Sequence, residues 1–191
     1  MFKLGDRYLT PILFTLFLLT TQNTSAQIIP DLTLKRESSQ VTNKAKVQNL
    51  PATLISGGAQ RKHNLFHSFT EFNVKTGERV YFANPQNIEN IFTRVTGNNI
   101  SKIFGTLGVN GSANIFLLNP NGIVFGKDAR LDVAGSFLAT TADSFVFKNG
   151  FKYSASISSS PPLLTVNLPI GLQFGELAEA IVNKSQAVDD F

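Results

Sequence analysis

Residues 114–126 read Asn-Ile-Phe-Leu-Leu-Asn-Pro-Asn-Gly-Ile-Val-Phe-Gly, and the fold depends on how this stretch is interpreted. Two short runs of β-favouring residues flank Asn119-Pro120-Asn121-Gly122, where proline pre-sets one backbone dihedral and asparagine and glycine tolerate a positive φ. The pattern predicts strand, tight turn, strand. A hairpin is the usual product of such a pattern, and the corner of a repetitive solenoid is the alternative.

The spacing of phenylalanine favours the solenoid. Six Phe residues from position 82 onward each lie in a short β-favouring run bounded by Asn, Gly or Pro. A hairpin meander gives no reason for a double-length period, whereas a parallel β-helix stacks like residues from one coil to the next. Taken alternately, the six form two series with intervals of 21 to 24 residues, Phe82, Phe104 and Phe125, and Phe92, Phe116 and Phe137.

The predicted fold class is therefore all-β, a right-handed single-stranded parallel β-helix of the pectin-lyase-like kind, with the six Phe residues as interior ladders. A β-sandwich with coincidental Phe spacing remains the alternative. The polar segment 27–59 contains short apolar pieces and is predicted to cap one end of the core. Beyond Thr141 the regularity loosens, and a Ser-rich stretch followed by Pro161-Pro162 predicts hairpin-like excursions from the coil.

The N-terminus predicts export. Lys3 and Arg7 precede an apolar run at 12–19, and small residues at 24–26 follow it. The run is shorter than the roughly 20 apolar residues of a membrane span, so we predict a signal peptide over 1–26, cleaved near Ala26. The mature domain is then 27–191. It contains no cysteine, so burial and backbone hydrogen bonds must stabilise it without disulfides.

Composition excludes several classes of protein. Hydrophobic residues make up 42% of the 191 residues and charged ones 16%, which favours a folded domain over a disordered tail or coiled coil. Without residues 1–26, 15 basic and 12 acidic residues remain, a net charge of +3. Because no basic stripe with interleaved aromatics is present, we expect no nucleic-acid partner.

Residues that could carry chemistry are sparse. No thiol is available, and His63 and His67 lack nearby carboxylates, so we predict no metal site and no cofactor and place both at the surface or a strand edge. Asp128, Arg130 and Asp132 alternate with apolar residues and would share the outer face of one wall. Some β-helix enzymes that cleave polyuronides carry acidic and Arg residues there, but a solvated strand is favoured because no second acid/base cluster accompanies them. No catalytic residue is predicted.

Several segments together resemble a known family, the N-terminal secretion domain of filamentous-haemagglutinin-type exoproteins. The resemblance covers about 28–187, and its most specific element is Asn119-Pro120-Asn121-Gly122-Ile123. A second motif of the family is matched approximately by Asn84-Pro85-Gln86-Asn87-Ile88. The other matching segments are Asn64 to Phe69, Phe72-Asn73-Val74, Tyr81-Phe82-Ala83, Arg94 to Asn99 and Ile103 to Leu107.

The resemblance implies a two-partner secretion domain. Such a domain crosses the inner membrane on a signal peptide and is recognised in the periplasm, still extended, by the POTRA-type domains of an outer-membrane barrel transporter. It then folds at the cell surface as a β-helix. By this resemblance the transporter-recognition residues are Asn119, Pro120, Asn121, Gly122 and Ile123, with Asn84 and Pro85 as a second set.

Three functions are consistent with the sequence. The main hypothesis is a non-enzymatic secretion domain of an adhesin-like protein, found in the medium or at the cell surface. Family members usually continue into a long passenger that could contact host or neighbouring cells; this chain stops at Phe191, as either a truncated product or a domain acting alone. A small polysaccharide-degrading enzyme and a freestanding surface adhesin are the alternatives.

Overall fold

The computed structural model describes residues 28–148, 150–156, 167–176 and 178–186. Across these residues the regular structure is β, apart from one 3-10 turn, η1 (Lys35–Glu37), which confirms the predicted all-β class. None of the described residues forms a helix long and apolar enough to cross a membrane. The predicted signal peptide, 1–26, and the stretch containing Pro161-Pro162 lie outside the described residues.

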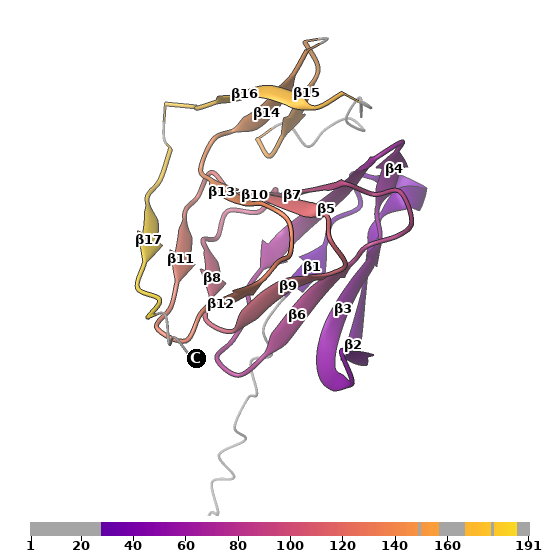
Figure 1. Cartoon of the computed structure of the whole chain (residues 1–191). Helices are drawn as coiled ribbons and strands as arrows, with labels where there is room; N and C mark the ends of the chain where they lie inside the picture. The colour runs from indigo at the N-terminus through magenta and orange to yellow at the C-terminus, as the bar shows by residue number, and fades with distance from the viewer. Residues whose placement is uncertain (1–27, 149, 157–166, 177, 187–191) are drawn as a thin grey trace, which may run out of the picture.

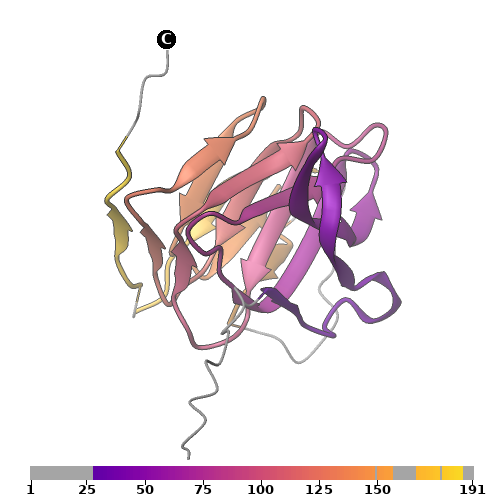
Figure 2. The ribbon, with the colours of Figure 1, turned by 90° about the horizontal axis from the view of Figure 1, so that it is seen from below.

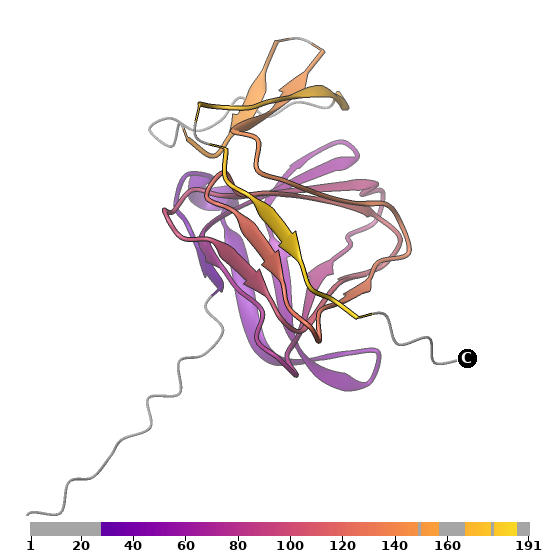
Figure 3. The same cartoon turned by 90° about the vertical axis from the view of Figure 1, so that its left-hand side faces the viewer.

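Three walls of parallel strands form the body of the domain (Figure 1). The first wall, across the middle of Figure 1, contains β5 (Asn64–Phe72), β7 (Asn90–Val95), β10 (Asn114–Leu118) and β13 (Phe137–Thr140). The second wall, which faces the viewer in Figure 3, contains β8 (Ser101–Ile103), β11 (Ile123–Phe125) and β17 (Ile181–Asn183). The third wall contains β6 (Arg79–Ala83), β9 (Thr106–Asn110) and β12 (Arg130–Asp132).

The strand register confirms the predicted parallel β-helix. Asn64 lies opposite Asn90, and Asn90 opposite Asn114, at separations of 26 and 24 residues along the chain. The stretch 114–126 contains β10 and β11, which belong to different walls. It is therefore a corner of the solenoid and not a hairpin. Backbone groups of each coil pair with those of the next, which is how a solenoid satisfies its hydrogen bonds without a second sheet.

Antiparallel strands close the N-terminal end, as the cap prediction required. The strands β1 (Ile28–Pro30) and β4 (Ala59–Arg61) both pair with the free edge of β5. The hairpin of β2 (Ser39–Val47) and β3 (Leu50–Gly57) extends the third wall, with β3 parallel to β6. In Figure 2 this cap lies at the opposite end of the stack from β17. At that far end, β12, β13 and β17 each have a neighbour on one side only.

The first wall is covered on both faces over β5, β7 and β10, whereas Leu138 of β13 is 37% exposed. The inner face of the wall lines the interior of the coil, where Leu65, Ile91 and Ile115 are at most 2% exposed. Its outer face is covered by an excursion of three antiparallel strands, inserted in the chain between β13 and β17 and seen above the first wall in Figure 1. Strands covered on both faces read as nearly continuous apolar runs. The excursion consists of β14 (Ser144–Phe147), β15 (Lys152–Ser154) and β16 (Pro169–Gln173).

The predicted phenylalanine ladders are largely wrong. Phe92 and Phe116 do stack, with ring centroids 4.7 Å apart, but on the outer face, where Phe66 is the third member at 5.2 Å from Phe92. Phe137 is displaced by one residue and lies opposite Ile115. The other predicted series fails because its members lie on different walls or outside a strand: Phe82 in β6, Phe104 after β8 and Phe125 in β11.

Unequal coil lengths explain the error. Equivalent residues of successive first-wall strands are separated by 26, 24 and then 22 residues. Phe residues spaced by 21 to 24 residues therefore do not all fall at equivalent positions. A shift of one residue moves a side chain to the opposite face of its strand.

Candidate functional site

The candidate motif 119–123 forms the corner between the first and second walls. Asn119 is fully buried, and its Nδ2 donates to the carbonyl oxygen of Asn99 at 3.0 Å and to Ser101 Oγ at 2.9 Å. Both partners belong to the equivalent corner of the preceding coil. Its Oδ1 accepts from the backbone N–H of Asn121 at 3.0 Å, and its carbonyl accepts from Gly122 N at 3.2 Å. Asn119 therefore shapes its own turn and joins it to the coil below.

The remaining motif residues complete this corner. Asn121 Nδ2 donates to the carbonyl oxygen of Gly97 at 2.8 Å, a second bond to the preceding corner. Gly122 has φ +111, a conformation that favours glycine, and Ile123 is fully buried in the inner core. The Pro120 carbonyl accepts from Glu179 N at 3.2 Å, so the chain entering β17 lies along the other side. In the folded domain, both Asn side chains of the motif are engaged in internal bonds.

The second motif, Asn84 to Ile88, forms the corner between the third and first walls. Asn84 Oδ1 accepts from Ser112 N at 2.9 Å and Ala113 N at 3.0 Å, and its Nδ2 donates to the Ile88 carbonyl at 2.9 Å. Ile88 is 5% exposed, and its N–H donates to the Pro85 carbonyl at 3.1 Å. This closing bond lies one position further along the motif than the bond from Gly122 N to the Asn119 carbonyl in the first corner. The two corners also lie at different edges of the coil, so they do not form one joint surface.

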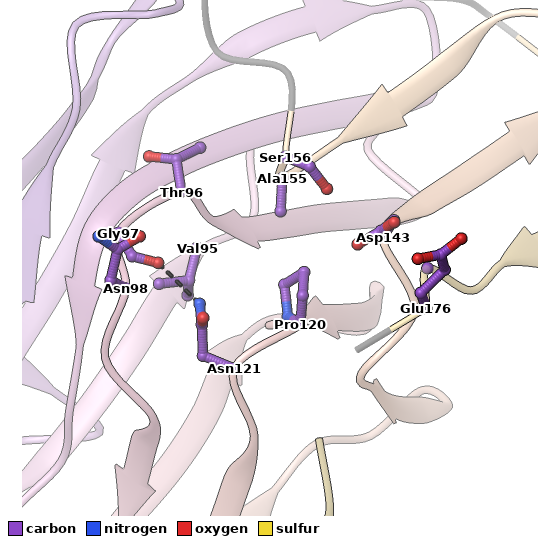
Figure 4. Close-up of a pocket in the computed structure, with 11 residues that line it drawn as sticks. Val95, Thr96, Gly97, Asn98, Pro120, Asn121, Asp143, Ala155, Ser156 and Glu176 are labelled. Carbon is purple, nitrogen blue, oxygen red and sulfur yellow. Dashed lines mark hydrogen bonds between the residues drawn. The ribbon is translucent and has the colours of Figure 1, made fainter. Parts of the chain in front are cut away.

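A cavity of about 520 Å³ adjoins the first of these corners (Figure 4). Pro120 and Asn121 line one side, and residues of the excursion and its flanks, including Asp143, Ser156 and Glu176, line the other. Asp143, Ser156 and Glu176 carry side-chain oxygen atoms, whereas Val95 and Pro120 are apolar. Among the described residues no group of three or more His, Cys, Asp or Glu side chains is placed to hold a metal ion.

The three charged residues of the enzymatic alternative have separate surroundings. Asp132 accepts hydrogen bonds from Tyr81 Oη at 2.6 Å and from Gln48 Nε2 at 3.2 Å, so it joins the third wall to the β2–β3 hairpin. Burial, followed by this bond to Asp132, raises the pKa of Tyr81. Asp128 lies in the exposed turn before β12, and Arg130 is exposed at the start of that strand. The geometry gives Asp132 a structural role.

The two histidines differ, and the surface prediction is wrong for one of them. His63 is exposed, and its Nδ1 lies 2.9 Å from the Asn87 carbonyl. His67 is fully buried on the inner face, with Nδ1 2.9 Å from Ser39 Oγ. Its Nε2 and the neighbouring Thr93 Oγ1 are the buried side-chain atoms of the described residues that have no hydrogen-bond partner. Burial lowers the pKa of His67 to about 3.

A ladder of asparagines was missed in the sequence. Asn90 Nδ2 donates to Asn64 Oδ1 at 3.2 Å, Asn114 Nδ2 donates to Asn90 Oδ1 at 3.0 Å, and Asn114 Oδ1 accepts from Ser136 N at 2.8 Å. The signal is present, because Asn-Leu-Phe at 64–66, Asn-Ile-Phe at 90–92 and Asn-Ile-Phe at 114–116 are the same tripeptide with one conservative change. The whole tripeptide gives the register that Phe alone does not.

Comparisons with known proteins agree on the family. The chain matches the TPS secretion domain over residues 26–190. It is 30% identical over 136 residues to a heme/hemopexin-binding protein of Haemophilus influenzae strain Rd, which is 71% of this chain and 14% of that protein. A second heme/hemopexin-binding protein of Haemophilus influenzae is 39% identical over 72 residues, 38% of this chain and 7% of that protein. No solved structure matches the chain significantly.

Proposed function

Because this chain belongs to the TPS secretion domain family, we propose that it directs an exported protein to a partner transporter in the outer membrane. The family match supports a role in secretion through the periplasm, and TPS domains in general interact with such a transporter. Recognition takes place in the periplasm through POTRA-type domains, and the chain folds as a β-helix after reaching the cell surface. The mature domain begins after a signal peptide cleaved near Ala26.

One observation carries the idea that the chain is recognised before it folds. Asn119 is fully buried, so a transporter that contacts its side chain must meet it in an extended chain. An extended segment can add to the sheet edge of a periplasmic domain, with apolar residues such as Leu117 and Ile123 entering pockets. Folding then withdraws Asn119 and Ile123 from the transporter, because both become fully buried.

The open last coil supports a continuation of the solenoid. The matched relatives are much longer than this chain, which spans 14% of one and 7% of the other. We propose that in a longer exoprotein the free edges of β12, β13 and β17 template the next coil of a passenger. Contact with host or neighbouring cells belongs to that passenger. The relatives' names refer to heme and hemopexin binding, and the short matched segment supports export as the shared role.

A secretion assay tests the proposal. The chain is co-expressed with its partner transporter, and the amounts in periplasm and medium are compared for Asn119→Ala, Asn121→Ala and the control Asn110→Ala, which changes an exposed asparagine outside both motifs. We expect release of the two motif variants to fall at least about tenfold while the control is released normally. Normal release of both motif variants would sink the assignment of the motif.

A second measurement separates recognition from folding. Purified periplasmic domains of the transporter are mixed with the folded chain and with the chain freshly diluted from urea, and binding is followed by fluorescence anisotropy. Binding should be confined to the unfolded chain and weakened by Asn121→Ala. Equal binding of the folded chain would contradict recognition in the extended state.

The enzymatic alternative has its own assay. Incubation of the folded domain with polyuronides should give no unsaturated or reducing-end product, because Asp132 is engaged with Tyr81. Appearance of a product that Asp132→Asn abolishes would restore the enzyme hypothesis. The freestanding adhesin stays an open prediction, tested by glycan and cell binding of the purified domain.

A further inference from the structure

Arg94 is the largest fully buried side chain of the described residues. It projects from β7 on the outer face of the first wall, opposite Ser68 of β5 and Leu118 of β10. A guanidinium cannot lose its charge at any ordinary pH, so its burial requires compensating contacts.

Those contacts come from segments far apart in the chain. Arg94 Nε donates to Ser68 Oγ at 2.8 Å, and Nη2 donates to Thr33 Oγ1 at 2.8 Å. Nη1 donates to the carbonyl oxygen of Ser154 in β15, and the Arg94 Cζ lies 4.6 Å from the centre of the Tyr153 ring. The N-terminal cap and the excursion therefore meet at one cation.

A carboxylate balances this charge through hydroxyl groups. Asp31 accepts from Ser68 Oγ and from Thr33 Oγ1, each at 2.6 Å, and from Thr96 Oγ1 at 2.7 Å. Burial alone would raise the pKa of Asp31, but hydrogen bonds from Ser68, Thr33 and Thr96 outweigh it and lower that pKa. Asp31 is thus ionised at neutral pH. The hydroxyl groups of Ser68 and Thr33 accept from Arg94 and donate to Asp31. They therefore connect the cation to the carboxylate by hydrogen bonds.

We propose that this network, the Arg94 latch, makes docking of cap residues 31–33 and docking of the excursion depend on each other. Without the cap, a docked excursion buries Arg94 far from its counter-charge, and without the excursion the cap lacks the Ser154 and Tyr153 contacts that complete the site. An uncompensated buried charge is strongly destabilising. The outer face of the first wall then closes in one cooperative step. The latch is a property of the fold and holds whether or not a transporter reads the motif at 119–123.

Hydrogen exchange of the full chain tests the latch by changing Asp31 in the cap and measuring amide exchange in β15 of the excursion. Asp31→Asn changes a residue of the cap. The Asp31 carboxylate bonds to Thr33 in the cap and to Ser68 and Thr96 at the first wall, and it makes no hydrogen bond to the excursion. We expect the amide protons of β15 and of Ala155 to exchange about tenfold faster in this variant. Glu37→Gln is the matched control, because Glu37 is the cap's other acidic residue and pairs with Arg61 at the surface; β15 should exchange there at the wild-type rate.

The charge on Arg94 is tested by repeating the substitution in an Arg94→Met background. Methionine fills much of the volume without a charge, so Asp31→Asn should no longer accelerate exchange in β15. Thr33→Val, which removes one hydroxyl of the relay, gives the same signature at smaller size if Asp31→Asn does not fold. Unchanged β15 exchange in the folded Asp31 or Thr33 variant, or equal acceleration with and without Arg94, would overturn the latch.

Discussion

The two Asn-Pro corners differ in length, with four residues between β10 and β11 and six between β6 and β7, and they join the coils in opposite directions. Asn119 reaches back to Asn99 and Ser101 of the preceding coil as a donor, whereas Asn84 reaches forward to Ser112 and Ala113 of the following coil as an acceptor. Each motif ends four residues later in a buried isoleucine, Ile123 or Ile88 in the respective corner. Both motifs have a positive φ at the fourth position, Gly122 or Asn87, and they differ in where the side chain of the first Asn lies.

Burial is the main difference between them. Asn119 is fully buried, so its amide has no access to water, while Asn84 is partly exposed. At the third position Asn121 bonds to Gly97, whereas the exposed Gln86 has no recorded side-chain hydrogen bond. The first corner therefore fixes the coil, and the second tolerates more variation.

The largest expected difference in stability is at the first residue of each corner, Asn119 or Asn84. Asn119→Ala removes four hydrogen bonds of a fully buried side chain and leaves Ser101 Oγ without its donor, so we expect a loss of about 3 kcal/mol in the free energy of unfolding. Asn84→Ala should cost about 1 kcal/mol, because water can replace part of its bonding. Urea unfolding followed by circular dichroism measures both. Equal losses at the two positions would remove burial as the distinguishing factor.

Acid should weaken the domain through the interior and leave both corners intact, because neither motif contains a titratable side chain. His67 has a pKa of about 3 when folded and an ordinary value of 6.5 when unfolded. Below pH 6.5 His67 binds a proton in the unfolded chain and stays neutral in the folded domain. The free energy of unfolding therefore falls as the pH drops from 6.5 toward 3. The loss at pH 5 is about 2 kcal/mol.

Unfolding titrations at pH 7.5 and pH 5 measure that loss, and His67→Leu is the matched variant. Its stability should change less between the two pH values. If the variant and the wild type lose the same amount, another group is responsible and the assignment to His67 is wrong.

The fourth position of each corner offers an opposed pair of substitutions. Gly122 has φ +111, and an added Cβ would lie 3.2 Å from the Ala180 carbonyl, so Gly122→Ala should cost about 1.5 kcal/mol. Asn87 already has φ +66, so Asn87→Gly should relieve strain and change stability by less than about 0.5 kcal/mol. Thermal unfolding of both variants measures the contrast. A destabilised Asn87→Gly would show that its side chain matters more than its backbone.

The smallest effect concerns the third position. Asn121→Ala loses the bond to Gly97 and should cost about 1 kcal/mol, whereas Gln86→Ala should cost less than about 0.3 kcal/mol. The two variants are compared by differential urea unfolding. A Gln86 variant as unstable as the Asn121 variant would mean that the approximate motif is as constrained as the close one.

Much of the fold was predictable from local pattern. Turn residues at 119–122 and β-favouring runs on both sides predict strands joined by a corner, and the double-length period of Phe predicts a solenoid. The polar segment 27–59 with its short apolar pieces predicts the cap. The ladder residues were not predictable from Phe alone, because coils of 26, 24 and 22 residues do not keep a constant period in register. The Asn-Leu-Phe and Asn-Ile-Phe tripeptides contain that register, since the Asn amides must pair across coils.

The sequence by itself determined the all-β class, the corner motif and the family, because turn chemistry and strand propensity are local properties. Only the tertiary structure decided which face of each strand is inside. The excursion covers the first wall from outside, so Phe66 and Phe92 are buried there, while His67 is buried in the interior. The tertiary structure also brings Asp31, Arg94 and Ser154 together, although more than 100 residues separate the first of them from the last. Face and long-range contact depend on register and on what covers each wall, and both are set only when the coils stack.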